Sequence, residues 1–278
     1  MKIKRMSYPY LIWLIIFILV PILLVGFFAI TEGDSVNFGD FQLSLANFQR
    51  FFTATYMKVL YKSVKLSGIS TLICLVVGYP LAYIIANEEG SRKNLLLLLL
   101  LIPMWMNFLL RTYSWLSILG RNGFINGVLV RLGLKPLKLI YTEGAVLMGM
   151  VYNFLPFMVL PIHSVLVKID KSLIEAAKDL GADRRTIFTR VIFPLSISGV
   201  ITGITMVFIP AVSTFVISSL LGGNKYNLIG NIIEQQFRYT GDWHFGSSMS
   251  IILMIFILIT MRLTDKFDKD DTKGGGGI

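Results

Sequence analysis

The chain has 278 residues, a formal net charge of +10, 55% hydrophobic residues and only 15% charged residues. This composition is too apolar for a water-soluble domain, in which the apolar share is about 45–50%. In a membrane protein an excess of Lys and Arg is typical of cytoplasmic loops, so the charge is no sign of nucleic-acid binding.

Six segments are long and apolar enough to cross a bilayer, which takes roughly 20 helical residues. In chain order they are Tyr8 to Ile30, Leu66 to Ala86, Leu95 to Ser117, Ala145 to Val167, Ser196 to Leu221 and Trp243 to Leu263. No polar stretch between them is long enough for a separate soluble domain. We therefore expect an all-α membrane protein with six transmembrane helices in one domain over residues 1–278.

The first segment follows Lys2, Lys4 and Arg5 and lacks an A-x-A-like cleavage site, so we expect it to remain as an uncleaved anchor. With these residues in the cytoplasm, six crossings place the N- and C-termini on the cytoplasmic side, together with most Lys and Arg residues. The bias is modest, because outward loops, among them the one between the third and fourth segments, are also basic.

Small residues recur along two of the segments. Gly78, Ala82 and Ala86 share one helix face, as do Gly199 and Gly203, and this spacing favours close helix contact in lipid. Four prolines interrupt helical hydrogen bonding and predict kinks in three segments. These prolines are Pro80, Pro156, Pro161 and Pro210.

Cysteine and histidine are scarce. Cys74 is the only cysteine, which excludes an internal disulfide and a thiolate metal cluster within the chain. His163 and His244 are far apart and form no recognisable metal motif. We expect no metal site.

The loop from Lys168 to Leu195 carries helix signals of its own. Ser172 and Glu175 have the spacing of a capping box, and Gly181 stands where a helix-ending C′ glycine is expected. This pattern predicts a helix over about Leu173 to Leu180.

A second helix follows in the same loop. Asp183 can cap it, it extends through Arg190, and Pro194 then leads into the fifth segment. The loop is therefore a charged helical hairpin at the membrane face. One interpretation is that it merely lies on the lipid headgroups.

A second interpretation rests on the spacing of residues in this loop. Glu175-Ala176-Ala177, Gly181 and Pro194 have the spacing of the EAA loop of binding-protein-dependent ABC permeases, which this stretch resembles. The family ending is I-x-L-P, whereas Val191 and Phe193 here replace the Ile and Leu. The resemblance implies a type I (MetI-like) ABC importer permease fold.

In that family the loop helix couples a separate ATPase subunit to the membrane helices. Small alanines suit entry into a cleft on that partner, with charged neighbours pairing at its rim. The residues that the resemblance assigns to this coupling are Glu175, Ala176, Ala177, Lys178, Asp179, Gly181 and Pro194. No G-x-x-x-x-G-K-[ST] phosphate loop occurs in the sequence, so we expect ATP and Mg on the partner ATPase, no cofactor on this chain and no enzymatic activity of its own.

Further stretches, in order over nearly the whole chain, resemble the polyamine branch of these permeases. They are Gly78-Tyr-Pro-Leu-Ala-Tyr83, Leu110-Arg-Thr-Tyr-Ser-Trp115, Asn122-Gly-Phe-Ile-Asn126, Leu155-Pro-Phe-Met-Val-Leu-Pro161, Phe208-Ile-Pro-Ala211, Phe215-Val-Ile217, Leu220-Leu-Gly-Gly223 and Gly241-Asp-Trp-His-Phe-Gly246. The resemblance implies a spermidine/putrescine importer in a bacterial inner membrane, with a second permease subunit, a cytoplasmic ATPase dimer and an extracytoplasmic polyamine-binding protein.

Other functions remain open at this point. The same permease class also carries iron, sulfate, thiosulfate and other small solutes. A secondary transporter or channel would need buried charges for an ion relay, and the cores of the six segments have none apart from residues at their edges. A passive scaffold would need no EAA-type loop.

A polyamine route needs carboxylates, amide or hydroxyl oxygens and aromatic faces, each of which favours an ammonium group that is losing water. The candidates are Trp105, Asn107, Tyr113, Trp115, Tyr152, Asn153, Ser213, Thr214, Glu234 and Asp242. Each also has an ordinary explanation as an interfacial aromatic, an interhelical hydrogen bond or a solvated charge. Ser213-Thr214 departs from the polyamine pattern, in which an acidic residue is expected before Phe215.

Overall fold

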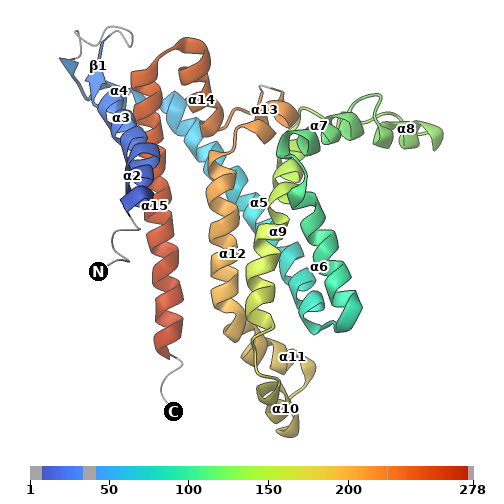
Figure 1. The fold of residues 1–278 in the computed structure, drawn as a ribbon. Helices are drawn as coiled ribbons and strands as arrows, with labels where there is room; N and C mark the ends of the chain where they lie inside the picture. The colour runs from blue at the N-terminus through green and yellow to red at the C-terminus, as the bar shows by residue number, and fades with distance from the viewer. Residues whose placement is uncertain (1–7, 34–41, 224, 275–278) are drawn as a thin grey trace.

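The computed structural model describes residues 8–33, 42–223 and 225–274, with side chains up to residue 264. The N-terminal cations Lys2, Lys4 and Arg5, on which the predicted orientation depends, lie outside the described residues. Within this part of the chain, five helices are long and apolar enough to span a bilayer, and a bent helix pair makes a sixth. The architecture is helical with one two-stranded ribbon (Figure 1).

The first helix stands at the edge of the bundle. It comprises α2 (Tyr8–Leu14), the π-helical η1 (Ile15–Leu19) and α3 (Val20–Ala29), and its apolar side chains are mostly exposed, as lipid contact requires. It lies beside the last helix, α15 (Trp243–Gly274), in Figure 1. His244 Nδ1 joins the two, 3.1 Å from both the Thr31 hydroxyl and the Phe28 carbonyl oxygen.

Short elements cover the edge of the bundle at the end of α3. Strand β1 (Thr31–Glu32) pairs antiparallel with β2 (Gln42–Leu43), and α4 (Ala46–Phe51) follows. Phe51 is buried in a cluster with Phe245 and Met249 of α15. This cluster packs the first turns of α15 against α4.

Three helices form the core, namely α5 (Ala54–Asn87), α9 (Glu143–Leu166) and α12 (Phe193–Ser213), and each packs against the other two. A Cβ added at Gly203 would lie 2.7 Å from Met158 Sδ, and one added at Gly78 would lie 3.0 Å from Met158 Cγ. The small-residue faces predicted from the sequence are therefore where α5 and α12 approach α9.

The predicted third span, Leu95 to Ser117, is wrong as one continuous helix. The chain forms α6 (Gly90–Trp105), turns, and continues as α7 (Phe108–Leu119) and α8 (Phe124–Arg131), with a bend of 96° between the first helix and the other two. Asn107 causes the restart, because its Oδ1 accepts hydrogen bonds from the backbone N–H groups of Leu109 and Leu110.

The predicted fifth span, Ser196 to Leu221, also breaks. Helix α12 ends at Ser213, and a separate α13 (Val216–Gly222) follows. Asn231, on α14 (Ile229–Gln235), donates a hydrogen bond of 2.9 Å to the Phe215 carbonyl oxygen and so holds the break. A hydrogen bond from another helix thus stabilises a break in a segment that hydropathy alone predicts as one helix.

The remaining predicted spans agree with long helices, although α5 begins twelve residues before the predicted Leu66. The π-helical η3 (Gln236–Thr240) links α14 to α15. Helices α10 (Lys171–Asp179) and α11 (Arg184–Ile187), joined to α12 by the π-helical η2 (Phe188–Ile192), lie at the lower end of Figure 1, and α7, α8, α13 and α14 lie at the opposite end.

Candidate functional site

The helical hairpin α10–α11 begins at a different cap from the one predicted. Asp170, not Ser172, is the N-cap residue, and its Oδ1 accepts a hydrogen bond of 2.9 Å from the Ser172 backbone N–H. The backbone and side-chain hydrogen bonds from Ser172 hold the pKa of Asp170 below its usual range. The helix therefore starts two residues earlier than the predicted Leu173.

Asp183 caps α11, as the sequence predicted. Its Oδ1 accepts a hydrogen bond of 3.0 Å from the Thr186 backbone N–H. The side-chain and backbone hydrogen bonds from Thr186 lower the pKa of Asp183. Both caps are therefore ionised at neutral pH, and their contribution to helix stability is lost only as the pH falls through these lowered pKa values.

Gly181 ends α10 as predicted. Its φ is +78°, its N–H donates to the Lys178 carbonyl oxygen at 2.9 Å, and the Ala182 N–H donates to the Ala177 carbonyl oxygen at 3.0 Å. These two bonds form a Schellman motif, which requires a left-handed residue and so favours glycine. The turn between α10 and α11 is fixed by this backbone geometry.

The two alanines of the loop motif face different ways. Ala177 and Ile174 pack against the hydrophobic core, whereas Glu175, Ala176 and the charged Lys178 and Asp179 are exposed. Ala176 is therefore the more accessible of the two alanines. Ala177 instead attaches α10 to the bundle.

The outward face of α10 includes two leucines that the sequence analysis missed. Leu180 is 88% exposed and Leu173 is 49% exposed. With Ala176 between them, their spacing of three and four residues places all three on one helix face. This periodicity is the sequence signal that would have identified an apolar contact surface.

An aromatic cluster connects the hairpin to the membrane helices. The ring of Phe188, in η2, lies 5.8 Å from the rings of both Tyr79 and Tyr83 on α5, edge to face. The Tyr79 hydroxyl is 2.7 Å from the Ser196 hydroxyl on α12. Because Phe193 and Pro194 begin α12 directly after η2, the hairpin is connected to α12 through the chain and contacts α5 through Phe188.

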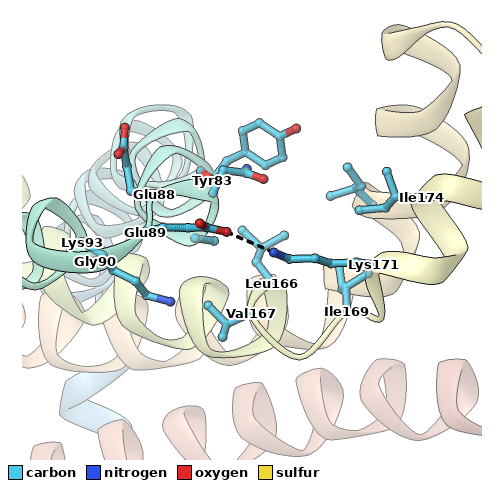
Figure 2. Close-up of a pocket in the computed structure, with 13 residues that line it drawn as sticks. Tyr83, Glu88, Glu89, Gly90, Lys93, Leu166, Val167, Ile169, Lys171 and Ile174 are labelled. Atoms are coloured by element: carbon cyan, nitrogen blue, oxygen red, sulfur yellow. Dashed lines mark hydrogen bonds and ion pairs between the residues drawn. The ribbon is translucent and has the colours of Figure 1, made fainter.

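A cavity of about 420 Å³ lies between α10, the end of α9 and the link from α5 to α6. Figure 2 shows Lys171 reaching from the start of α10 to Glu89 in this link, with 3.2 Å between Lys171 Nζ and Glu89 Oε1. Both side chains are 83% exposed, so this ion pair is weak and easily broken. Ile174 and Leu166 form the apolar wall.

At the opposite end of the bundle, α7, α13, α14 and η3 line a cavity of about 820 Å³. Tyr113 and Glu234 both reach it, together with Asn231, Arg238 and Tyr239. Glu234 Oε1 lies 2.9 Å from Arg238 Nη1. The structure therefore brings two of the predicted route residues, Tyr113 and Glu234, to one cavity. Arg238 forms an ion pair with the Glu234 carboxylate.

Ser213 lines a second, more apolar cavity of about 550 Å³, which Glu234 and Arg238 also line. Its hydroxyl donates back to the Ile209 carbonyl oxygen at 3.3 Å. Thr214, the next residue, is the extended residue at which α12 ends. The break thus places Ser213 in the same cavity as Glu234, the acidic residue of α14.

The other aromatic and amide candidates form separate contacts. Trp115 and Tyr152 pack edge to face at 5.2 Å between α7 and α9. Asn153 is buried, and its side-chain amide donates to the Gly149 carbonyl oxygen at 2.7 Å. Trp105 is 78% exposed at the end of α6, and Asn107 caps α7.

Asp242 has a structural role in this arrangement. Its Oδ2 lies 2.8 Å from Arg50 Nη1, and its Oδ1 accepts a hydrogen bond of 3.0 Å from the Phe245 N–H at the start of α15. It does not line the cavity that contains Glu234. The structure separates these two predicted acids.

Comparison with known sequences places these features in a family. Residues 78–270 match the model of the binding-protein-dependent transport system inner membrane component. The spermidine/putrescine transport system permease protein PotB of Haemophilus influenzae is 40% identical over 249 residues, which are 89% of this chain and 87% of that protein. PotB of Escherichia coli is 40% identical over 87% of this chain and 89% of its own length.

Solved structures share the fold. A bacterial ABC transporter that imports the acidic polysaccharide alginate contains a chain that superposes with a TM-score of 0.82 at 16% identity, covering 97% of this chain and 95% of that one. A chain of the MetNI methionine ABC transporter gives a TM-score of 0.57 at 17% identity, covering 77% of this chain. At these identities the likeness concerns the fold alone.

Proposed function

We propose that this chain, which belongs to the binding-protein-dependent transport system inner membrane component family, is the permease subunit of an ABC importer for spermidine and putrescine. The observation that carries the substrate assignment is the 40% identity, over 89% of the chain, to a permease named for these two polyamines. The chain is not itself an enzyme, because its relatives are permease subunits.

The α10–α11 hairpin is the docking element for the ATPase. Leu173, Ala176 and Leu180 form an exposed apolar face, and Glu175 and Asp179 add charge beside it. Such a face suits a helix that enters a cleft on a soluble partner. ATP and Mg are bound by that partner, and its closure moves the hairpin as a rigid body.

The aromatic contacts of Phe188 carry this movement into α5 and α12. Substrate delivered by an extracytoplasmic binding protein enters the pathway formed with a second permease subunit, and ATP hydrolysis resets it. Because the hairpin lies at the same end of the bundle as the end of α15 (Figure 1), an ATPase bound to it requires that end to be cytoplasmic. This orientation agrees with the predicted cytoplasmic C-terminus in a bacterial inner membrane.

The cavity that contains Tyr113, Asn231 and Glu234 is the proposed entry to the pathway for the polyamine. A carboxylate and a phenol ring are groups that bind a desolvating ammonium. The Asn231 amide already bonds to the Leu228 N–H and the Phe215 carbonyl oxygen, so it supports the cavity wall. Arg238 forms an ion pair with the Glu234 carboxylate in this cavity. An incoming ammonium group would replace this guanidinium.

Coupling is tested by co-expressing the chain with its partner subunits in a bacterial strain that neither makes nor imports polyamines. We expect Glu175→Ala and Gly181→Val to abolish growth on added spermidine while the subunit inserts at normal levels. Lys168→Gln, which changes an exposed side chain shortly before α10 and outside the coupling set, is the control and is expected to keep full growth. Full growth of both the Glu175 and Gly181 variants would refute the coupling role.

A further inference from the structure

The segment 119–140, here called the basic arm, leaves the bundle sideways at the end opposite the hairpin (Figure 1). It contains α8 and carries four cations, Arg121, Arg131, Lys135 and Lys138. No Asp or Glu occurs between Gly90 and Thr142 in the sequence. The arm is therefore a surface of one charge sign, and it repels a polycationic substrate.

The basic arm is held in one conformation by a buried amide. Asn126 is 1% exposed, and its Nδ2 donates to the carbonyl oxygens of Gly120 and Leu137, both at 3.0 Å. Its Oδ1 accepts from the Leu137 N–H at 2.8 Å. These three bonds close the arm into a loop.

A glycine turn makes this closure geometrically feasible. Helix α8 ends at Gly133, whose φ is +76°, and the Leu134 N–H returns to the Leu129 carbonyl oxygen at 2.9 Å. The chain reverses there and returns toward Asn126. The arm therefore presents a preformed surface that needs no ordering when a ligand binds.

The same arm exposes large apolar side chains. Phe124 is 75% exposed and Leu132 is 69% exposed, and Leu134 and Leu137 are also more than half exposed. Apolar side chains interleaved with Lys and Arg are typical of helices that lie in the interface of a bilayer. A solvated loop would not need this apolar surface.

A cavity of about 370 Å³ lies at the base of the basic arm. Arg121 and Lys138 line it together with Leu119, Pro136, Leu137 and Ile140. Two cations beside apolar walls match the chemistry of a phospholipid, whose phosphate is anionic and whose adjoining chains are apolar. The cavity is thus suited to one headgroup.

The bend at Asn107 places the arm at the level of the headgroups. Helix α6 has 16 residues, which is about 24 Å of helix, and so crosses most of a hydrocarbon core of roughly 30 Å. Because α7 and α8 then run at 96° to α6, they follow the membrane surface. Beyond the edge of the bundle, the surface that α8 meets is the bilayer.

We propose that the basic arm binds anionic phospholipid in the leaflet opposite the hairpin, with Arg121 and Lys138 on the headgroup phosphate and Phe124 and Leu132 in the acyl boundary. The inference rests on the membrane-spanning fold and is independent of the transported substrate. Binding there anchors α7, which lines the cavity containing Glu234.

The test uses the full importer complex in nanodiscs of phosphatidylcholine with added phosphatidylglycerol. Phe124→Cys is labelled with a bimane fluorophore, and Cys74 does not interfere because it is fully buried. Quenching is measured with bromine on the acyl chains of either lipid. We expect brominated phosphatidylglycerol to quench the probe more strongly than brominated phosphatidylcholine.

Charge variants identify the recognition groups. The double variant Arg121→Gln, Lys138→Gln is expected to remove the preference for phosphatidylglycerol. The matched control Lys58→Gln, Lys225→Gln removes two exposed cations from the same end of the bundle and is expected to keep the preference. Equal quenching by both lipids in the complex that keeps Arg121 and Lys138 would refute headgroup recognition. No quenching by either lipid would also refute the proposal, because protein and not lipid would then cover the arm.

Discussion

The ion pair between Glu234 and Arg238 places two opposite charges at one end of an apolar bundle. Glu234 has a side chain only 19% exposed and shares its cavity with a tyrosine and an asparagine, and its partner Arg238 is one helical turn away. A carboxylate in such a position attracts a cation more strongly than one in water. Under the proposed route, Arg238 therefore competes with any ammonium group that reaches Glu234.

This competition predicts opposite effects for the two partners. Glu234→Gln should raise the KM for spermidine uptake roughly 10-fold, because a hydrogen bond to a charged group contributes about 1.5 kcal/mol or more. Arg238→Gln should lower the KM, because it frees the carboxylate. The measurement is the initial rate of labelled spermidine uptake against concentration.

Asp242→Asn is the control for this pair of variants. Asp242 binds Arg50 and caps α15, and asparagine is an equally good cap, so the KM should stay unchanged. If Glu234→Gln and Arg238→Gln shift the KM in the same direction, the competition is disproved.

Residue-level prediction from the sequence succeeded where the signal was local. The Asp183 cap and the Gly181 helix end depend on neighbours within a few positions, and both are present. The start of α10 was misplaced because Asp170, two residues before Ser172, offers the same capping chemistry. The contact of Asp242 with Arg50 spans 192 positions and has no local signal.

Among the elements, η2 connects the docking hairpin to the transport helices. We expect Phe188→Ala to lower spermidine uptake while the complex still hydrolyses ATP, because the aromatic contacts to Tyr79 and Tyr83 are lost. Uptake and ATP hydrolysis are measured on the same proteoliposomes. Phe17→Ala, on a lipid-exposed position of the first helix, is the control and should leave both rates unchanged.

A Phe188→Ala complex with normal uptake per ATP hydrolysed would show that movement reaches α5 and α12 by another route. A complex that loses uptake and ATP hydrolysis together would place the defect in ATPase docking instead. Partial recovery by Phe188→Tyr, which restores the ring, is expected from the edge-to-face geometry.

A large side chain at Gly199 would crowd the contact between α12 and α9. A Cβ there would lie 3.0 Å from the Ile162 Cα and from the Pro161 carbonyl oxygen, which are backbone atoms and cannot move aside. We expect Gly199→Leu to destabilise the folded chain by about 1–3 kcal/mol, as overpacking does. Thermal unfolding in detergent measures this effect.

Gly68→Leu is the matched control, because a Cβ at Gly68 meets no atom within 4 Å. Its unfolding temperature should equal or exceed that of the unmodified chain, since leucine favours helix over glycine. Equal destabilisation by both substitutions would mean that the α12–α9 contact is not the cause.

Element prediction was sound for spans that end at polar residues and wrong for spans that break within an apolar run. Hydropathy joins α6 to α7 and α12 to α13, because both junctions lie within long segments that are mostly apolar. The breaks come from side-chain amides, Asn107 within its own turn and Asn231 from a distant helix. Only the first of these was visible locally, as an asparagine in an apolar segment.

At the scale of the whole molecule, the proposed function assigns one end of the bundle to a soluble partner and the other to substrate. The hairpin projects from the lower end of Figure 1, and the cavity with Glu234 opens among the short helices at the opposite end. Helices α5 and α12 connect the two ends, since both begin or finish at the aromatic cluster around Phe188. Under the proposed function, α5 and α12 are therefore the path along which docking would act on the cavity with Glu234.

The family and this architecture were predictable from the sequence because the loop motif is compact and the spans are strongly apolar. The gathering of Tyr113, Ser213 and Glu234 near one another was not, because it depends on two helix breaks. The polyamine assignment came from resemblance and agrees with the relatives at 40% identity.

The most direct test of this assignment is uptake by the purified complex in proteoliposomes that contain ATP. The complex joins this chain to its second permease subunit, its ATPase and its binding protein. We predict ATP-dependent accumulation of labelled spermidine that unlabelled putrescine reduces and that unlabelled sulfate leaves unchanged. An intact complex that hydrolyses ATP but accumulates neither polyamine would contradict the account.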